Sequence, residues 1–592
     1  MKKTITFLLA IVAFCQSFHA QEPTLPRGLS EAEQSWLAQG APGFNPPPPF
    51  GITDPPALPI RAMAEWEELQ ALVVVWRLYK DILADIINAA KQECKVVVAC
   101  SNIQTWKNEL TSYGVDWSQN VDFIQASSNS FWVRDYGGQP CYLNDVDSLA
   151  WVDWIYNRPR PLDDVMPELF GQYFKMPVYT TTVAPNDLVN TGGNFMTDGI
   201  GRAFASKLVL DENDSTNTWG QSNHSEAEVE EIMNAYLGID PYIKMTILPY
   251  DGIHHIDMHM KLLDEVTLLV GEYPSGIADG PQIEANLQYV LSNFTSSYGT
   301  PFNVIRVPMP PDKSNLYPHQ GGDYRTYANA VFVNKTIIVP TYKEQYDTTG
   351  LRIWRESMPG YNIVGVNCDE MIFLGGAVHC ITKEVGVTDP LAISHRRLDD
   401  ITDVNPPAYE VKATIRHRSG ITSASVFYKT DPGAAYQELP MALVSPVDNL
   451  WTAAIPQQPG GSTVYYYIHA TANSGKQISR PMPAPEGYFH LKINASTGTT
   501  DLTKENARLG DVFPNPAGAI TCIPVFSANN STATLELSDC LGRRLETIFS
   551  GTLPAGESKY FFHADRLQSG VYVVSLRTAK GIFSQKVLVK NN

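Results

Sequence analysis

A change of pattern near residue 400 is the feature that most constrains how this chain can fold. From about residue 61 to residue 398, short apolar runs typical of strands alternate with amphipathic stretches typical of helices. From about residue 406 onward the helical pattern disappears, and β-rich runs bounded by turn residues remain. The sequence therefore predicts an α/β domain followed by all-β modules.

The chain has 592 residues, too many for one ordinary hydrophobic core, so we expect several domains. Lys2 and Lys3 precede a short apolar run, and Ala20 is a small residue suited to cleavage, which indicates an export signal. No later segment is apolar enough to cross a membrane. We predict a signal peptide at 1–20, a Pro-rich linker at 21–60, the α/β domain at 61–400, an immunoglobulin-like β-sandwich at 405–495 and a terminal β-module at 508–592.

Composition limits the class of partner and supplies a reactive group. The net charge of -18 disfavours phosphate binding, so we expect no nucleic-acid partner, whereas a cationic substrate would be attracted. Cys15 would leave with the leader, and the seven cysteines that remain are an odd number, so at least one thiol stays free. A free thiol can serve as a nucleophile.

Two stretches combine residue types suited to catalysis. Cys380 follows the pair Gly375-Gly376, and glycines let the backbone approach a ligand closely. His255, Asp257 and His259 have strand spacing, so on a strand all three would share one face. Such a group could move protons and bind a cation, or it could hold a metal. A buried, inert cysteine and a solvated polar face are the structural alternatives.

Four further stretches carry candidate binding residues. Trp132 precedes Arg134-Asp135, which by itself is typical of a structural ion pair. Arg158 and Arg160 flank a proline, so their guanidinium groups could clamp a carboxylate, although a solvated basic loop has the same composition. Asn194 and Asn329 are the remaining candidates, each in a short polar segment.

In this order, the motifs resemble the guanidino-group-modifying superfamily, the penteins. More narrowly, the chain resembles the branch that joins agmatine deiminases to the Porphyromonas-type secreted peptidylarginine deiminase. The matching text is Ala64-Glu65-Trp66-Glu67, Trp132-Val133-Arg134-Asp135-Tyr136, Asn157-Arg158-Pro159-Arg160-Pro161, Thr191-Gly192-Gly193-Asn194, His255-Ile256-Asp257, Tyr327-Ala328-Asn329 and Gly376-Ala377-Val378-His379-Cys380. The terminal module resembles the C-terminal sorting domain of the type IX secretion system through Phe513-Pro514-Asn515-Pro516, Ser569-Gly570-Val571-Tyr572-Val573 and Lys586-Val587-Leu588-Val589-Lys590.

The resemblance implies a pseudo-symmetric propeller of five ββαβ blades with the site at its centre. It also implies roles for individual residues. Asp135 and Asp257 would hold the substrate guanidinium, Cys380 would attack its carbon, His255 would protonate the departing ammonia, and Asn329 would help to order the site. It implies no catalytic cofactor and allows a structural calcium ion. The terminal module implies export by the type IX machinery of a Bacteroidetes-type bacterium, to the cell surface or the medium.

The paired arginines bear on the substrate. The resemblance to the secreted peptidylarginine deiminase implies that Arg158 and Arg160 recognise the carboxylate of a C-terminal arginine. Agmatine lacks a carboxylate, so these residues favour peptidyl or free arginine over agmatine. Trp132 and Asn194 complete the expected substrate-binding set. The alternatives are agmatine deimination, a non-catalytic surface binding protein that kept the fold, and a metal-dependent hydrolase that uses His255, Asp257 and His259.

Overall fold

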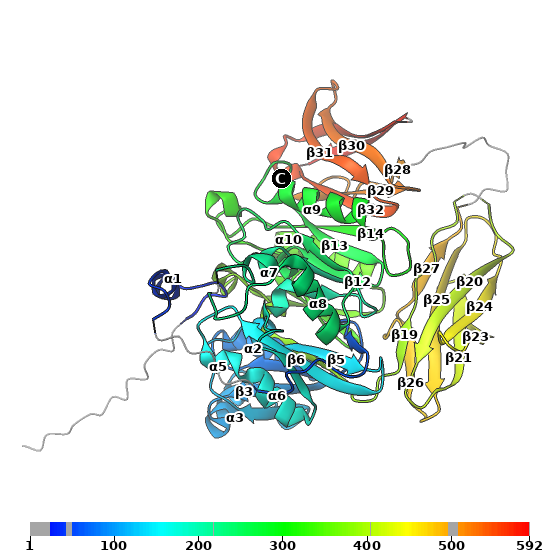
Figure 1. The fold of residues 1–592 in the computed structure, drawn as a ribbon. Coiled ribbons are helices and arrows are strands. Elements are labelled where there is room, and N and C mark those ends of the chain that lie inside the picture. The colour runs from blue at the N-terminus through cyan, green and yellow to red at the C-terminus, as the bar shows by residue number, and fades with distance from the viewer. Residues whose placement is uncertain are drawn as a thin grey trace, which may run out of the picture.

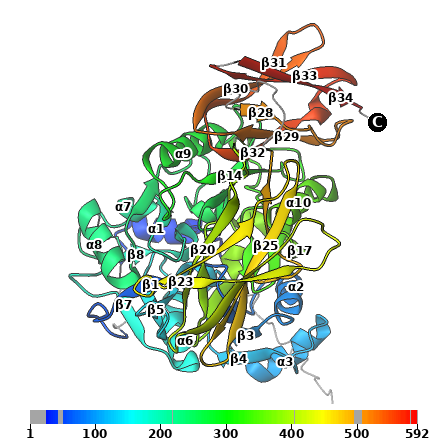
Figure 2. The same cartoon turned by 90° about the vertical axis from the view of Figure 1, so that its right-hand side faces the viewer.

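The computed structural model describes residues 24–42, 50–216, 218–402, 404–494, 507–579 and 581–590. The expected signal peptide lies outside these residues, as does most of the linker after residue 494. Figure 1 shows three bodies: an α/β domain in blue to green, a β-module in yellow beside it, and a C-terminal β-module in orange and red against α9 (Gly280–Asn293) and β14 (Asn303–Pro308). The view in Figure 2 places the same modules next to the α/β domain.

One structural unit occurs five times in the described part of the α/β domain. Each unit pairs two antiparallel strands, continues through a helix and adds a third strand parallel to the second. This crossover is the usual way to join parallel neighbours. Three units are β9 (Met196–Thr197), β10 (Ala203–Ser206), α8 (Glu226–Leu237) and β11 (Tyr242–Met245); β12 (Met260–Asp264), β13 (Thr267–Glu272), α9 (Gly280–Asn293) and β14 (Asn303–Pro308); and β15 (Val331–Val333), β16 (Thr336–Thr341), α10 (Glu344–Ser357) and β17 (Asn362–Asn367).

The other two units carry extra strands, and one of them joins both ends of the domain. The first comprises β5 (Gln139–Leu143), β6 (Ser148–Tyr156), α6 (Met166–Phe174) and β7 (Val178–Thr181), extended by β1 (Ile60–Ala62) and β8 (Val189–Asn190). The second comprises β18 (Lys383–Gly386), β2 (Leu69–Val75), α2 (Lys80–Ala90) and β3 (Lys95–Cys100), followed by α3 (Ile103–Ser112) and β4 (Val121–Gln125). Pairing of β18 with β2 ties the C-terminal end of the domain to its start.

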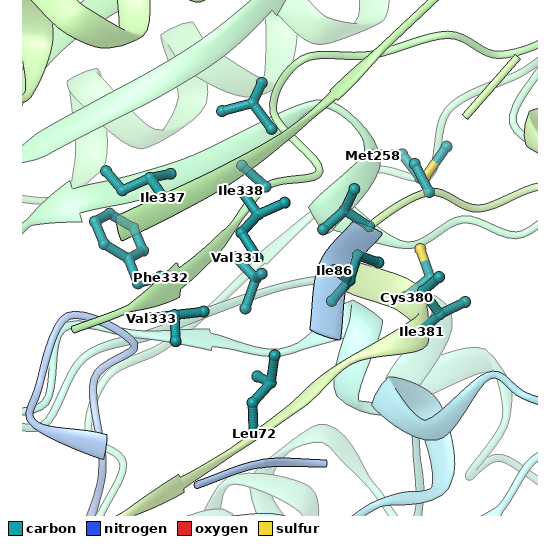
Figure 3. Packing of buried hydrophobic residues seen from close by; sticks show 14 of the residues in the cluster. Leu72, Ile86, Met258, Val331, Phe332, Val333, Ile337, Ile338, Cys380 and Ile381 are labelled. Carbon is teal, nitrogen blue, oxygen red and sulfur yellow. The ribbon is translucent and has the colours of Figure 1, made fainter. Parts of the chain in front are cut away.

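The alternation of apolar strands with amphipathic helices that the sequence predicts for the α/β domain is confirmed. Leu72, Val331 and Ile338 lie in strands with apolar runs, and α2 is one of the amphipathic helices. These strands are buried on both faces, which explains why they read as continuous apolar runs. Figure 3 shows residues of several units in one core, with Cys380 among them. The five units equal the implied number of blades, and their arrangement about one axis stays a prediction.

The second body is all-β, as the sequence predicts. Its two sheets share one apolar core. The sheets contain β19 (Ala392–Ser394), β20 (Ala408–Arg416), β24 (Leu450–Pro456) and β23 (Ala442–Ser445), and β22 (Gln437–Pro440), β21 (Ile421–Lys429), β25 (Thr463–Ala472), β26 (Gln477–Arg480) and β27 (Phe489–Lys492). Because β19 pairs with β20 and Leu391 belongs to this core, the module begins before the predicted residue 405.

The C-terminal body is also built from two sheets. They contain β28 (Ala507–Leu509), β29 (Ile520–Ser527) and β32 (Gly556–His563), and β31 (Arg544–Leu553), β30 (Ser531–Asp539), β33 (Gly570–Thr578) and β34 (Gly581–Val589). Three apolar side chains of this module pack in the core of the α/β domain and not in the module's own core: Ile520, Cys522 and Phe561. The module is therefore docked on the domain through apolar contacts.

The Pro-rich stretch differs from the extended linker that composition suggests. Residues 31–38 form the helix α1 (Glu31–Ala38), which begins at a capping box in which Ser30 and Glu33 bond reciprocally. Ahead of the helix, the guanidinium of Arg27 is fully buried in the α/β domain. The many prolines indicate that long helices and strands are absent here. They do not indicate that the Arg27 side chain is buried in the α/β domain.

Candidate active site

The candidate site lies where the five units begin. A short turn precedes the first strand of each unit: α4 (Val133–Tyr136), η1 (Gly192–Asn194), η2 (Ile256–Met258), the segment at Asn329, and η5 (His379–Ile381). These turns contact one another directly. Arg134 Nε donates to the His379 carbonyl at 3.2 Å, the His379 amide donates to Asn329 Oδ1 at 3.0 Å, and Asn329 Nδ2 donates to the Asp257 carbonyl at 3.3 Å.

Two carboxylates from different turns, Asp135 and Asp257, bind the guanidinium of Arg27. Arg27 Nε and Nη2 donate to Asp135 at 2.9 Å each, and Arg27 Nη1 and Nη2 donate to Asp257 at 3.0 Å each. All three nitrogens are thereby used, in the planar two-pronged geometry that suits an arginine and a carboxylate. Burial would raise the pKa of Asp257, but Arg27 and His379 outweigh burial and hold it far below its usual range. The site therefore selects a guanidinium cation.

The thiol of Cys380 lies beside this pair. Its Sγ is 3.2 Å from Asn329 Nδ2 and 3.8 Å from Asp257 Oδ2. Burial raises the pKa of the thiol well above its ordinary value, while the positive charge of Arg27 acts in the opposite direction. Burial makes a thiolate unfavourable, so the thiol stays protonated even beside Arg27, and a base has to take its proton before it can attack.

His255 is placed at the same nitrogen that both carboxylates share. A Cβ added to Gly193 would lie 1.7 Å from Arg27 Nη2 and 2.6 Å from His255 Nδ1, so those two nitrogens are no farther apart than the sum of these distances. Asp135 Oδ1 is 3.5 Å from His255 Nδ1. Burial, followed by the charge of Arg27, lowers the pKa of His255 to about 3. With Arg27 bound, His255 is therefore neutral at pH 7.

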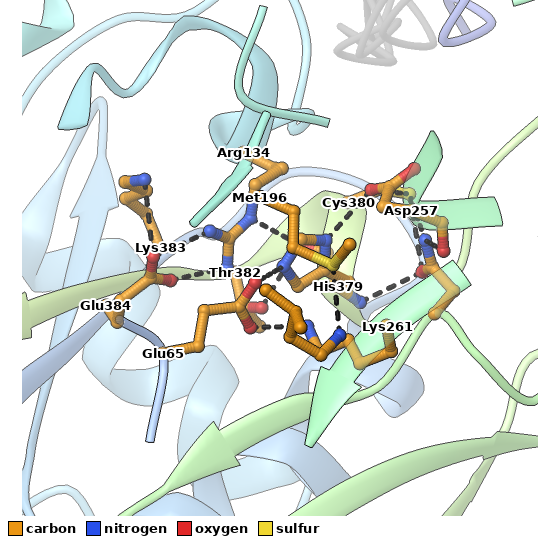
Figure 4. A network of polar contacts seen from close by, with 12 residues as sticks. Glu65, Arg134, Met196, Asp257, Lys261, His379, Cys380, Thr382, Lys383 and Glu384 are labelled. Carbon is orange, nitrogen blue, oxygen red and sulfur yellow. Dashed lines mark hydrogen bonds and ion pairs between the residues drawn. The ribbon is translucent and has the colours of Figure 1, made fainter. Parts of the chain in front are cut away.

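A buried network behind the site contains two residues to which the sequence motifs gave no role. His379 Nδ1 lies 2.8 Å from Asp257 Oδ2, and His379 Nε2 lies 3.0 Å from Glu65 Oε1. Glu65 also binds Lys261, as Figure 4 shows. Glu65 lies in the motif Ala64-Glu65-Trp66-Glu67, and His379 lies in Val378-His379-Cys380. Only the fold shows that the two side chains are in contact. Their contacts orient the carboxylate of Asp257.

Three of the four predicted substrate-binding residues contact main-chain oxygens of the segment around Arg27. Trp132 Nε1 donates to the Leu25 carbonyl at 3.0 Å, and Arg158 Nε donates to the Arg27 carbonyl at 3.0 Å. Arg160 Nη2 donates at 2.9 Å to the carbonyls of both Pro26 and Gly28. All four of these hydrogen bonds go to main-chain carbonyl oxygens, so they do not depend on the side chains of residues 25–28.

Asn194 is placed differently from the prediction. Its side chain bonds both main-chain polar groups of Ser206, accepting from the amide at 2.7 Å and donating to the carbonyl at 3.3 Å. It fixes η1 to β10 and directs no polar atom to Arg27. The neighbouring Gly193, which was not predicted, is the residue of this turn that borders the guanidinium.

The expectation that His255, Asp257 and His259 share the face of a strand is wrong. Residues 256–258 form a 3₁₀ turn, in which alternate side chains do not align. Within the described ranges, no group of three or more His, Cys, Asp or Glu side chains is placed to hold a metal ion. The structure therefore gives no support to the metal-dependent alternative, and the structural calcium ion stays a prediction.

The described cysteines form no disulfide. Cys380 is one of seven free thiols in these residues, and all but Cys540 are buried.

A cavity of about 480 Å³ lies where the three bodies meet, lined by residues such as Leu263, Arg397 and Lys559. It shares no residue with the turns around Cys380, where Arg27 fills the space. No helix in the described ranges has both the length and the apolar character of a membrane span.

A thiol and two carboxylates arranged around a guanidinium define a hydrolase of guanidino groups. Residues 61–385, more than half of the chain, match the family described as Porphyromonas-type peptidyl-arginine deiminase, and the chain belongs to this family. Residues 511–590 match the secretion system C-terminal sorting domain, which identifies the terminal module as a type IX sorting domain.

Individual relatives cover the α/β domain. A Mycoplasma capricolum protein that carries an agmatine deiminase name is 24% identical over 367 residues, which are 55% of this chain and 95% of the relative. Among solved structures, the agmatine deiminase of Enterococcus faecalis has a TM-score of 0.47 and 20% identity, covering 55% of this chain and 95% of its own. A Porphyromonas gingivalis structure named as an arginine deiminase has a TM-score of 0.47 and 18% identity, covering 55% and 98%.

Proposed function

We propose that the chain is a cysteine hydrolase that converts the arginine of a peptide to citrulline and releases ammonia. One observation carries this proposal: an arginine within a polypeptide occupies the site, with its guanidinium between Asp135 and Asp257. Its main-chain carbonyl is bound by Arg158 at the same time. The carboxylate of a C-terminal arginine would place an oxygen at this same position, so the site suits that substrate as well.

The reaction proceeds through a covalent thiouronium. The Cys380 sulfur bonds to the guanidinium carbon, and the proton of the thiol is carried by His255 to the nitrogen that leaves. Nη2 is that nitrogen, because His255 lies beside it. The bond from carbon to Nη2 breaks and ammonia departs. Water, deprotonated by His255, then adds to the same carbon, the carbon–sulfur bond breaks, and citrulline and the free thiol result.

The surrounding charges support each step. Asp135 and Asp257 fix the guanidinium plane and hold its charge while the sulfur approaches. A bound guanidinium lowers the pKa of Cys380, so the substrate itself promotes formation of its nucleophile. His255 carries no proton of its own at pH 7, because its pKa is about 3 in the occupied site, so the proton that it passes to the leaving nitrogen has to come from the Cys380 thiol.

Agmatine is the second candidate substrate, because relatives of the chain carry that name. Agmatine has a guanidinium and lacks the main-chain carbonyl to which Arg158 donates. Its free amine would also meet the positive charges of Arg158 and Arg160. We therefore place peptidyl arginine first.

Steady-state ammonia release should be compared for three substrates: a peptide ending in arginine, a peptide of the same composition with an internal arginine, and agmatine. We expect kcat/KM for either peptide to exceed that for agmatine. Faster turnover of agmatine would reverse the assignment. Arg158→Ala should narrow the difference between peptide and agmatine, because it removes a contact that only the peptide makes.

Two variants separate a deiminase from a surface protein that only binds. Cys380→Ser should abolish ammonia release, whereas Cys94→Ser, at another buried free cysteine, should retain it. Ammonia release that persists in Cys380→Ser would eliminate the mechanism, and release that is absent from the unaltered chain would favour the binding protein. Activity that survives strong chelation would separately exclude a metal-dependent reaction. For location, we propose export through the type IX machinery and attachment to or release from the cell surface.

A further inference from the structure

The occupant of the active site is part of the chain itself. The segment of residues 24–38, here called the N-terminal segment, runs into the site as far as Arg27 and out again to α1. Arg27 is completely buried, although it belongs to a segment outside the strands of the α/β domain. The Arg27 amide also donates to the Leu374 carbonyl at 2.8 Å, so its backbone is held on two sides.

The part of the segment that follows Arg27 is anchored by a second arginine of the site. Arg160 Nε donates to Glu33 Oε1 at 2.8 Å, and its Nη2 donates to Glu33 Oε2 at 3.0 Å. Glu33 at the same time closes the capping box of α1 with Ser30. The helix therefore starts where the site ends, and this fixes how far Arg27 reaches.

The contacts of Arg27 are those of a substrate. Its three guanidinium nitrogens satisfy both carboxylates, and Cys380 lies beside Asp257 and Asn329. A Cβ on Gly193 would collide with Nη2, so the turn is shaped to the guanidinium itself. The burial of Arg27 leaves no place for a second guanidinium between Asp135 and Asp257 while it is bound.

We propose that Arg27 is a modification site of the chain's own active centre: Cys380 deiminates Arg27 within the same molecule, and the product releases the N-terminal segment. This inference rests on the proposed function. The step is balanced as for any peptide: sulfur bonds to the Arg27 guanidinium carbon, Nη2 leaves as ammonia with the thiol proton, and water replaces sulfur to give citrulline. No oxidant or cofactor is required.

Release of the segment follows from the change in charge. Citrulline carries a neutral urea, so Asp135 and Asp257 lose the cation that compensates their buried charges. His379 and His255 stay beside the two carboxylates, but the neutral urea compensates neither buried charge, so water or an external arginine would replace the segment. One turnover in place would therefore open the site to peptides.

The test is mass spectrometry of residue 27 in the purified full chain and in Cys380→Ser. We expect citrulline at Arg27 in the active chain and unmodified arginine in Cys380→Ser. Limited proteolysis adds an independent readout: residues 24–38 should be cut at least about tenfold faster in the active chain than in Cys380→Ser, because only the latter keeps its buried ion pairs.

Mixing distinguishes reaction within one molecule from reaction between molecules. Isotope-labelled Cys380→Ser, incubated with unlabelled active chain, should keep arginine at position 27, because its own site buries that residue. Conversion of the labelled chain at the rate seen in the active chain would overturn the intramolecular step. Unmodified Arg27 in a chain that releases ammonia from peptides would overturn the inference alone, whereas loss of ammonia release from every guanidino substrate would mark failure of the proposed function.

Discussion

Gly193 sets the size of the site at the scale of single residues. Replacing it with alanine would put a carbon 1.7 Å from the guanidinium nitrogen Nη2 and 2.6 Å from His255 Nδ1. The guanidinium cannot shift without breaking its four bonds to the two carboxylates, so we expect Gly193→Ala to lower kcat/KM by about a hundredfold or more. Ammonia release from an arginine peptide measures this loss.

The adjacent glycine is the matched control for Gly193. A Cβ on Gly192 would lie 2.1 Å from the Arg134 carbonyl oxygen, which is backbone, and not close to the guanidinium. Gly192→Ala should therefore lower the melting temperature by disturbing the contact between η1 and α4. At a comparable fall in melting temperature, Gly193→Ala should lose far more activity than Gly192→Ala, and full activity in Gly193→Ala would contradict the assigned geometry.

His379 contacts Asp257 Oδ2, the oxygen that also accepts from Arg27 Nη2, and is a positioning residue. His379→Ala removes the Nδ1 contact to Asp257 and the Nε2 contact to Glu65. A hydrogen bond to a charged group contributes about 1.5–3 kcal/mol, so kcat/KM should fall about ten- to a hundredfold. His379→Asn keeps a donor near Asp257 and should recover part of kcat. A lower melting temperature with unchanged kcat/KM would reduce His379 to a structural role.

At the scale of elements, the cap of α1 controls how firmly the N-terminal segment is held. Ser30→Ala removes one side of the capping box, which stabilises a helix by about 1 kcal/mol. In the Cys380→Ser background, where Arg27 stays arginine, amide exchange of residues 31–38 should accelerate about fivefold. Hydrogen exchange monitored by mass spectrometry measures this rate.

A second capping box provides the comparison for Ser30. Ser225 and Glu228 cap α8 in the same reciprocal way, and neither belongs to the N-terminal segment. Ser225→Ala should speed exchange in α8 and leave residues 31–38 unchanged. An equal effect of both substitutions on residues 31–38 would show that α1 responds to global stability and not to its own cap.

The elements of the α/β domain could be predicted because their signals are local. Buried strands are apolar along their whole length, and helices repeat every three to four residues, so β2, α2 and β15 are visible in the text. The turns at the start of each unit are too short to show any periodicity. For this reason the strand expected at residues 255–259 is wrong, and η2 is found there. The prediction that Asp135, His255 and Cys380 share one site came from the family resemblance and not from the periodicity of the sequence.

Arg27 and His379 show what the sequence could not reveal. Arg27 stands in a Pro-rich stretch whose composition indicates a linker, and nothing local says that its side chain enters a site more than 100 residues away in sequence. His379 lies next to Cys380, yet its partners Glu65 and Asp257 come from distant segments. Such long-range pairing is decided by tertiary contacts, which neither spacing nor propensity encodes.

At the scale of the whole molecule, the three bodies form a continuous structure. Gln288 of α9 exchanges two hydrogen bonds with the backbone of Thr552 in the sorting domain, at 2.8 and 2.9 Å. Phe561 of that domain packs into the core of the α/β domain. On the other side, Arg480 of the second body binds Glu265 of the α/β domain at 2.9 Å. The accessory modules are therefore braced against the catalytic domain by both apolar and charged contacts.

The pair of Glu265 and Arg480 makes this association sensitive to pH. Burial raises the pKa of Glu265 to about 7, although Arg480 acts to lower it. A carboxyl whose pKa is higher in the folded than in the unfolded chain contributes its full stability below the unfolded value of about 4.5 and loses it as pH rises to about 7. The loss amounts to at most about 3 kcal/mol. Glu265→Gln cannot ionise, so its melting temperature relative to the unaltered chain should rise by several degrees between pH 5 and pH 8.

Calorimetry at a series of pH values measures this difference, and Glu410→Gln is its control. Glu410 is exposed in the second body and pairs with Lys412 at the surface, so its loss should leave the pH dependence of the unaltered chain intact. Asp164, Glu212 and Asp251, whose pKa values burial raises to about 7, are present in all three proteins and cancel in the comparison. If the melting temperatures of Glu265→Gln and the unaltered chain differ by the same amount from pH 5 to pH 8, the pKa of Glu265 is not raised as its burial implies.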